Sequence, residues 1–279
     1  MTSAGQTDEA LLAAARAGER PAIETLLERY QGRVFGFGLR MCGDTEDAKD
    51  VLQDTLLAAA RTVGDFRGDA SVSTWLYTIA RSFCIKKRRR SKFAPDEEVP
   101  LDRATLGLRS PAPGPEDQAA GDEVKHALAA ALEALDPASR EVMILRDIEG
   151  LTAPEVAAVT GASVDAIKSR LHRARAVVRQ RLGVALGDAT PARAPDCPDV
   201  LTAFSKQMEG ELEPRLCAEL QGHVERCAAC RATCDSLKRT LAVCAGASPG
   251  PVPAAVRNSV RAALRAALRP AAGGPGADT

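Results

Sequence analysis

Apolar residues recur at intervals of three and four along most of the chain, which predicts helices rather than strands. Before residue 91 this pattern predicts helices over 7–16, 21–39 and 44–62, and a fourth that Ser73 caps and that runs into 86–90. Later in the chain it predicts helices over 122–135, 137–148, 155–159, 163–181, 198–208 and 254–269, and one that starts at Pro214. Aromatic residues are only 3% of the 279, so we expect an all-α chain of small domains rather than one large core.

The stretch 151–181 predicts a helix-turn-helix. Thr152 followed three residues later by Glu155 forms a capping box, Gly161 is free to adopt positive φ in the turn, and Ser163 caps the second helix. The second helix has an apolar stripe, and its other faces carry Lys168, Ser169, Arg170, His172, Arg173, Arg175, Arg179 and Arg181. A basic helix behind a tight turn suits the DNA major groove. The alternative is an ordinary solvated helix in a three-helix core.

Two further surfaces carry candidate chemistry. Asp50, Gln53 and Asp54 fall at i, i+3 and i+4 and therefore share one helix face, which suits a basic partner helix if it is more than a solvated face. The loop 66–71 leads into a helix that bears Trp75 and ends in five consecutive cations at 86–90. That combination suits unstacked bases and a phosphate backbone. The alternative is that Trp75 belongs to the core and the cations are solvated.

Charge and composition divide the chain further. The net charge is zero, but the segment 96–123 has eight acidic and two basic residues and separates two basic blocks. Prolines add to that bias, so a linker is expected there and a second one over 188–195. No apolar run approaches 18 residues, and the first 20 residues lack the apolar core of a signal peptide. These features predict a cytoplasmic protein with no membrane partner.

Six of the eight cysteines lie in the last third of the chain, which points to a metal site rather than disulfides. Cys197, His223, Cys227 and Cys230 offer three thiolates and an imidazole, a donor set for tetrahedral structural zinc. Three further cysteines are either small buried residues or additional thiolates of a sensor for Zn²⁺, Cd²⁺ or copper, namely Cys217, Cys234 and Cys244.

The sequence resembles the extracytoplasmic-function (ECF) group of bacterial sigma factors. Three stretches carry the resemblance, in order and spacing: DTEDAKDVLQDTLLAAAR, FRGDASVSTWLYTIAR with the basic run, and LDPASREVMILRDIEGLTAPEVAAVTGASVDAIKSRLHRAR. It implies two helical sigma domains, σ2 and σ4, joined by a flexible linker. We divide the chain into σ2 (1–95), an acidic linker (96–121), σ4 (122–187), a linker (188–196), a cysteine-rich domain (197–245) and a tail (246–279) with an amphipathic helix.

The resemblance also implies partners and roles. Such a protein is not an enzyme; it binds core RNA polymerase and brings it to promoter DNA. The Asp50, Gln53 and Asp54 face would dock on the clamp helices of the β′ subunit. The −10 element would be read by Arg67, Ser71, Trp75, Tyr77, Arg81, Lys86 and Lys87, and the −35 element by Ser163, Asp165, Lys168, Ser169, His172 and Arg173. Ser82 departs from the Asn of many members, which puts details of −10 reading in doubt.

The cysteine-rich segment resembles the zinc-binding anti-sigma domain, which is normally a separate protein. Fusion to a sigma factor resembles the CorE-like, metal-responsive ECF subgroup, in which no separate anti-sigma protein is needed. The copper-responsive members carry a Cys-x-Cys pair that is absent here, so cadmium or zinc is favoured over copper.

Several alternatives remain open at this stage. Metal binding could free the polymerase-facing surfaces, or a zinc-loaded domain could inhibit until a thiol is oxidised. A one-component repressor would need only the helix-turn-helix, and a thiol redox enzyme would use the CxxC of Cys227 and Cys230. The helix 254–269 is expected to pack on a neighbouring domain, since a membrane-surface helix would want larger apolar residues.

Overall fold

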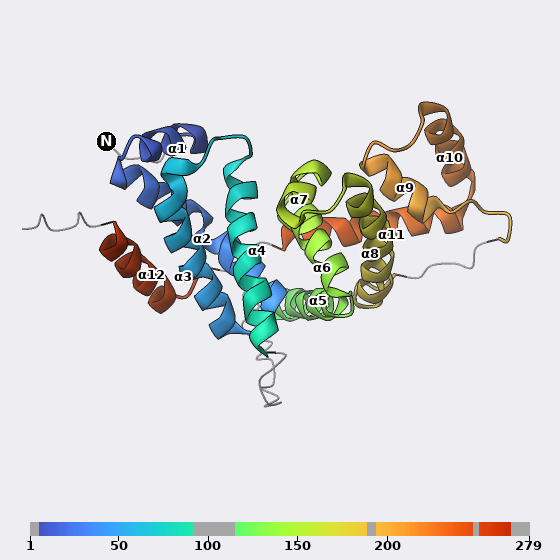
Figure 1. Cartoon of the computed structure of the whole chain (residues 1–279). Helices are drawn as coiled ribbons and strands as arrows, with labels where there is room; N and C mark the ends of the chain where they lie inside the picture. Colours follow the sequence, from blue (N-terminus) through green and yellow to red (C-terminus); the bar gives the residue numbers. More distant parts are fainter. Residues whose placement is uncertain (1–5, 92–114, 189–193, 248–250, 269–279) are drawn as a thin grey trace, which may run out of the picture. The chain divides into compact units, whose positions relative to one another are not determined.

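The computed structural model describes residues 6–91, 115–188, 194–247 and 251–268, and in these ranges it contains helices and turns but no strand. The chain divides into two compact units. The first comprises 1–98 together with 251–279, and the second comprises 99–250. Figure 1 colours the helices in chain order. None of the helices in the described ranges combines the length and apolarity that crossing a bilayer would need.

The first unit is a bundle of α1 (Asp8–Arg16), α2 (Arg20–Cys42), α3 (Thr45–Thr62) and α4 (Val72–Ser91), with a 3₁₀ turn, η2 (Val63–Asp65), after α3. Helices α2 and α3 cross closely because Gly38 has no side chain: a Cβ there would lie 3.2 Å from the Ala48 Cα. The rings of Phe37 and Tyr77 meet in the core with centroids 5.3 Å apart. Helix α4 begins two residues earlier than predicted, because Ser71 rather than Ser73 accepts the capping bond from the Thr74 amide.

Helix α12 (Ala254–Ala267) belongs to this first unit although it follows the cysteine-rich segment in sequence. It packs on α3 and buries the apolar stripe Val256, Val260 and Leu264. Its basic face pairs with α2: the Arg261 guanidinium lies 2.8 Å from the Glu28 carboxylate. The amphipathic pattern of the C-terminal segment is therefore satisfied by packing on a neighbouring domain, as expected from its small apolar residues.

The second unit begins with the helix-turn-helix fold. It consists of α5 (Pro115–Glu133), α6 (Pro137–Met143), the π-helical turn η4 (Ile144–Ile148), α7 (Ala153–Thr160) and α8 (Val164–Ala185). The predicted capping box of Thr152 and Glu155 is present, and Gly161 ends α7 in the left-handed region at φ 74°. The predicted stripe of Ile167, Leu171, Ala174 and Val178 is buried. Helix α5 starts inside the segment 96–121 that composition assigned to the linker.

The same unit contains α9 (Val200–Met208), α10 (Pro214–Arg226) and α11 (Ala228–Gly246). Helices α9 and α11 both pack on α8, and α11 also contacts η4. The cysteine-rich segment is thus built against the helix-turn-helix rather than apart from it.

Candidate nucleic-acid interface and metal centre

The four predicted metal ligands lie together. The donor atoms of Cys197, His223, Cys227 and Cys230 are all within 4.8 Å of one another. The Sγ atoms of Cys197 and Cys227 are 3.8 Å apart, and the His223 Nε2 lies 3.3 Å from the Cys230 Sγ. A tetrahedral zinc with Zn–S bonds of about 2.3 Å would hold its sulfur ligands roughly 3.8 Å apart. The donor set and its spacing therefore fit a structural zinc ion.

Helix ends position these ligands. Cys197 precedes α9, His223 lies in the last turn of α10, Cys227 joins α10 to α11, and Cys230 lies in the first turn of α11. Burial, together with the neighbouring thiols, raises the pKa of the Cys230 thiol to about 12. A bound cation would have to displace that proton, because metals bind the thiolate.

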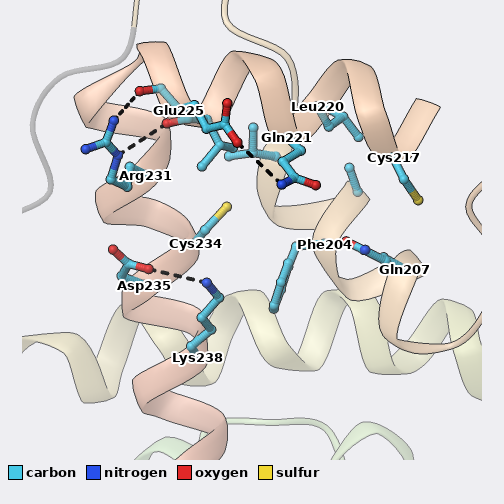
Figure 2. Close-up of a pocket in the computed structure, with 13 residues that line it drawn as sticks. Phe204, Gln207, Cys217, Leu220, Gln221, Glu225, Arg231, Cys234, Asp235 and Lys238 are labelled. Atoms are coloured by element: carbon cyan, nitrogen blue, oxygen red, sulfur yellow. Dashed lines mark hydrogen bonds and ion pairs between the residues drawn. The ribbon is translucent and has the colours of Figure 1, made fainter. Parts of the chain in front are cut away.

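The three other cysteines stand outside this cluster. Cys217 and Cys234 line a cavity of about 680 Å³ between α9, α10 and α11, together with Phe204 and Leu220 (Figure 2). Cys234 is buried and also packs with Val200 and Cys230 in the core of the segment. Cys244 is fully buried near the end of α11. The packing of Cys234 and Cys244 agrees with small buried residues, whereas Cys217 is half-buried. The role of all three as further metal ligands stays a prediction.

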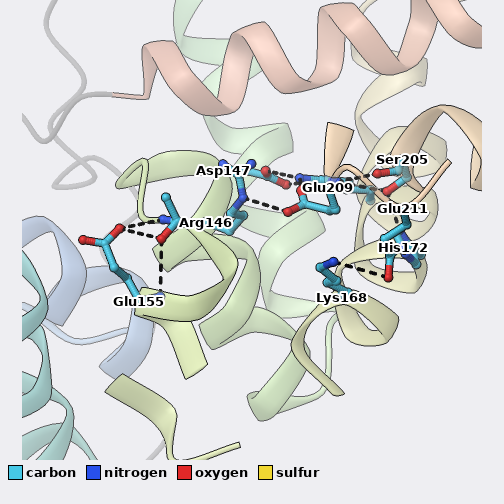
Figure 3. A network of polar contacts seen from close by, with 10 residues as sticks. Arg146, Asp147, Glu155, Lys168, His172, Ser205, Glu209 and Glu211 are labelled. Carbon is cyan, nitrogen blue, oxygen red and sulfur yellow. Dashed lines mark hydrogen bonds and ion pairs between the residues drawn. The ribbon is translucent and has the colours of Figure 1, made fainter. Parts of the chain in front are cut away.

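The side chains predicted to read the −35 element fall into two groups on α8. Those that are exposed are Ser163, Asp165, Ser169 and Arg173. Lys168 and His172 are instead engaged by the segment that follows α9 (Figure 3). The Glu211 carboxylate lies 2.8 Å from the His172 Nε2 and 3.6 Å from the Lys168 Nζ. The His172 Nδ1 is 2.8 Å from the Ser205 hydroxyl oxygen of α9. The acidic end of α9 thus occupies part of the predicted DNA-reading face.

Arg175 anchors this contact, although its sequence position suggested an exposed basic face. That expectation was wrong: its side chain is fully buried. It donates two hydrogen bonds to Asp147, at 2.8 and 2.7 Å, one to Glu209 at 2.7 Å and one to the Ser205 hydroxyl at 2.9 Å. Burial alone would lower the Arg175 pKa, but the bonds to Asp147 and Glu209 outweigh it and raise the pKa above its ordinary value.

Glu209 is the acidic residue that the cysteine-rich domain contributes to this network. Its side chain is almost fully buried and also accepts a bond from the Arg146 Nε at 3.2 Å (Figure 3). Burial opposes its ionisation, but Arg175 and Arg146 hold the pKa of Glu209 below its ordinary value. Sequence reasoning did not single out Ser205, Glu209 or Glu211. The only signal available was a pair of acids beside Gly210, directly after a short amphipathic helix.

The predicted −10 surface contains a cavity of about 320 Å³ lined by Phe66, Arg67 and Trp75, among others. The Phe66 and Trp75 rings stack with centroids 4.8 Å apart, and Trp75 is half-buried. Arg67 and Ser71 are exposed in the loop, Arg81 is half-buried on α4, and the exposed Lys86 lies over the Phe83 ring. Tyr77 requires a correction: it is 1% exposed in the core, so its ring does not face a bound base.

The predicted polymerase-docking face lies on α3, with Asp50 and Asp54 exposed and Gln53 half-buried. Lys87, assigned from the basic run to the −10 element, instead bridges this face. Its ammonium lies 3.1 Å from an Asp47 carboxylate oxygen and also donates to Asp50. The hydrogen bond to Asp50 raises the pKa of Lys87 above its ordinary value, so the ammonium is held in its charged form.

Comparisons with known proteins agree with this geometry. The family described as "Sigma-70 region 2" matches residues 26–93, "Sigma-70, region 4" matches 125–177, and "Putative zinc-finger" matches 197–231. A bundle, a helix-turn-helix and a zinc-finger segment in this order define a transcription initiation factor. The chain belongs to the ECF RNA polymerase sigma factors. Such proteins bind core RNA polymerase and promoter DNA, and they are transcription regulators rather than enzymes.

Three curated relatives illustrate the likeness. The ECF RNA polymerase sigma factor SigM of Mycobacterium tuberculosis is 34% identical, over 64% of this chain and 86% of its own length. The RNA polymerase sigma factor CnrH of Cupriavidus metallidurans is 35% identical, over 61% and 91%. The RNA polymerase sigma-H factor of Pseudomonas aeruginosa is 29% identical, over 66% and 98%. Among solved structures, CnrH in complex with the cytosolic domain of CnrY matches at 31% identity and a TM-score of 0.46, over 63% and 97%.

Proposed function

We propose that this sigma factor directs core RNA polymerase to promoters with −10 and −35 elements, under the control of its own zinc-loaded cysteine-rich segment. The segment acts in cis as a clamp on the −35 recognition helix, so no separate anti-sigma protein is required. In the CorE-like manner, the signal is a metal. Of cadmium and zinc, which the sequence favoured over copper, cadmium fits this inhibitory clamp because it can displace the resident zinc. Oxidation of a ligand thiol is the other route of release.

The observation that supports this proposal is the position of Glu211. Its carboxylate pairs with Lys168 and His172, two of the side chains predicted to contact the −35 element. A carboxylate there takes the place that phosphate or a base acceptor would take in a DNA complex. DNA and the cysteine-rich segment therefore compete for the same side chains.

The metal cluster is connected to this contact through α9. Cys197 stands before the helix, whereas Glu209 and Glu211 follow it and precede His223. Metal binding at Cys197, His223, Cys227 and Cys230 would fix both ends of the segment that carries the two glutamates. Of the two signs of control that the sequence left open, this arrangement supports inhibition by the zinc-loaded cysteine-rich segment.

The first test compares Glu211→Gln with Glu213→Gln in the zinc-loaded full chain. Glu213 is exposed and two residues further on, so it controls for the loss of one negative charge. Removing the charge at 211 should tighten binding to a −35 duplex by roughly 3–10-fold, the value of one partly exposed charge-assisted contact. Fluorescence anisotropy at fixed salt measures this. Equal affinities of both variants and the wild type would contradict the clamp.

Run-off transcription with core polymerase tests the control itself, with arms containing Zn²⁺, Cd²⁺, Cu²⁺, Cu⁺, a chelator or an oxidant. Transcripts that appear with a chelator, an oxidant or a displacing metal support the inhibitory clamp. Transcripts that require Zn²⁺ would reverse the sign of control. DNA binding without transcripts in any arm would overturn the initiation function in favour of a repressor.

A further inference from the structure

Two cysteines lie in the first unit, away from the metal cluster. Cys42 is the last residue of α2, and Cys84 lies on α4. Their sulfur atoms are 3.6 Å apart, although the residues are 42 positions apart in sequence. Neither cysteine forms a disulfide in this structure. A disulfide needs an S–S separation of about 2.05 Å, so small side-chain rotations would bring the sulfurs within bonding distance.

The two thiols differ in exposure and in electrostatic surroundings, which suits them to different roles. Cys42 is half-buried and within reach of a small oxidant, whereas Cys84 is 1% exposed. The sulfur–sulfur hydrogen bond to Cys84, helped by the nearby charges of Arg88 and Lys87, holds the pKa of Cys42 below its ordinary value. An accessible thiol with thiolate character beside a second, sheltered thiol is the arrangement of a peroxide-sensing pair.

We propose that Cys42 and Cys84 form a reversible disulfide on reaction with hydrogen peroxide. The Cys42 thiolate attacks one peroxide oxygen, the O–O bond breaks, and the departing hydroxide takes a proton to become water. The Cys84 sulfur then attacks the Cys42 sulfenic sulfur, the S–S bond forms, and the S–O bond breaks. The released hydroxide takes the Cys84 proton, so two thiols lose two electrons and one peroxide yields two waters.

The position of the bridge gives it a structural consequence. Cys42 adjoins the turn at Gly43 that leads into α3, and Cys84 is one turn before Lys87 on α4. Lys87 bridges Asp47 and Asp50 at the predicted polymerase-docking face. The disulfide would tie α4 to the α2–α3 corner at the foot of this ion-pair bridge. The breaking of the ion pairs between Lys87 and the docking face would therefore depend on whether Cys42 and Cys84 are oxidised.

Peptide mapping tests the proposal on the zinc-loaded full chain. The protein is treated with hydrogen peroxide, free thiols are blocked with N-ethylmaleimide, and the sample is digested with trypsin. Cleavage after Arg40, Lys49, Arg81 and Lys86 should release the peptides 41–49 and 82–86 joined by a disulfide. Dithiothreitol should separate them. Closing a loop of this length should also raise the unfolding temperature reported by Trp75, the only tryptophan of the chain, by roughly 5–15 °C.

Single substitutions complete the test. Cys42→Ser and Cys84→Ala should each abolish the linked peptide, while Cys244→Ser, which removes a buried thiol from the other unit, should retain it. In Cys84→Ala the Cys42 sulfenic acid should become trappable by dimedone. The proposal fails if Cys42 and Cys84 remain unlinked while other thiols oxidise, or if either forms a bridge with a cysteine of the cysteine-rich segment or with a second chain. If a variant does not fold, mapping of the wild type decides alone.

Discussion

The two surfaces predicted to read promoter DNA differ in what the rest of the chain does to them. On α8, Lys168 and His172 are held by Glu211, and the buried Arg175 fixes α9 alongside. Around Trp75, the loop side chains Arg67 and Asp69 are exposed beside a cavity. The predicted −35 surface is thus partly covered by residues of the same chain, whereas the loop of the predicted −10 surface is exposed. Control of this sigma factor is therefore expected at the −35 step.

Loss of a metal ligand should produce the largest difference between the two units. Cys230→Ser should abolish tight zinc binding and cost on the order of 5 kcal/mol or more of stability in α9–α11, because structural zinc supplies folding free energy. The first unit should keep its stability. Zinc content and helical circular dichroism report the former, and fluorescence of the single tryptophan reports the latter. Cys244→Ser is the matched control, and retention of tight zinc by Cys230→Ser would rule out the assigned ligand set.

Arg175→Ala should cause the second-largest loss, in the stability of the second unit. It leaves Asp147 buried without its cation and Glu209 with Arg146 alone, which costs about 3–5 kcal/mol for a broken buried ion pair. Urea unfolding of the second unit measures the loss. Arg173→Ala, at an exposed site two residues earlier, should change stability by less than about 0.5 kcal/mol. Similar losses in both variants would mean that the buried network does not hold α9 on α8.

Trp75→Ala addresses the uncovered surface. Removal of a stacking ring should weaken binding of the holoenzyme to single-stranded −10 DNA by about 1–3 kcal/mol. The loss should be the same with and without a zinc chelator. Tyr77→Phe should leave binding unchanged because that ring lies in the core. A Tyr77→Phe defect as large as that of Trp75→Ala would restore Tyr77 to the reading surface.

Low pH should have the smallest effect, a loss of the stability that the Glu209 ion pair gives to the contact between α8 and α9. The pKa of Glu209 is lowered in the folded state, so its stabilising effect is complete above its ordinary value of 4.5 and is lost as pH falls through the lowered value. Asp136 and Asp188 in the same unit also have lowered pKa values. The contribution of Glu209 is therefore isolated by the difference in the free energy of unfolding between wild type and Glu209→Gln. We expect that difference to shrink by roughly 1 kcal/mol between pH 5 and pH 3. A difference independent of pH would contradict the ion pair.

Local rules predicted much of this molecule. The capping box of Thr152 and Glu155, the turn at Gly161 and the stripe through Ile167 and Leu171 are short-range features, and the structure confirms them. The four ligands were also predictable, because Cys227 and Cys230 share a turn with His223 one turn earlier. Cys197 was predicted as the fourth ligand on chemical grounds, because a tetrahedral zinc site needs a fourth donor.

Long-range partners escaped prediction for a physical reason. Arg175 lies next to the apolar stripe, but arginine is rarely buried without a partner, and its partners Asp147 and Glu209 are 28 and 34 residues away. The prediction for Tyr77 was wrong in the opposite direction. An aromatic ring in a DNA-binding helix suggested stacking on a base, but the ring is buried against Phe37. Periodicity gives a face, but only tertiary contacts decide what covers it.

After the second unit, the chain returns to the first unit at α12. Everything from α5 to α11 is inserted between two segments that belong together, so the second unit is tethered at both ends. A single protease cut in the segment 92–114 would sever the covalent link on one side, yet the fragments would stay associated through α12 and its pairs with Glu24 and Glu28. Such a nicked protein would dissociate on dilution, because the cut makes the association of α12 with the first unit bimolecular. The intact chain instead holds α12 at a high effective concentration.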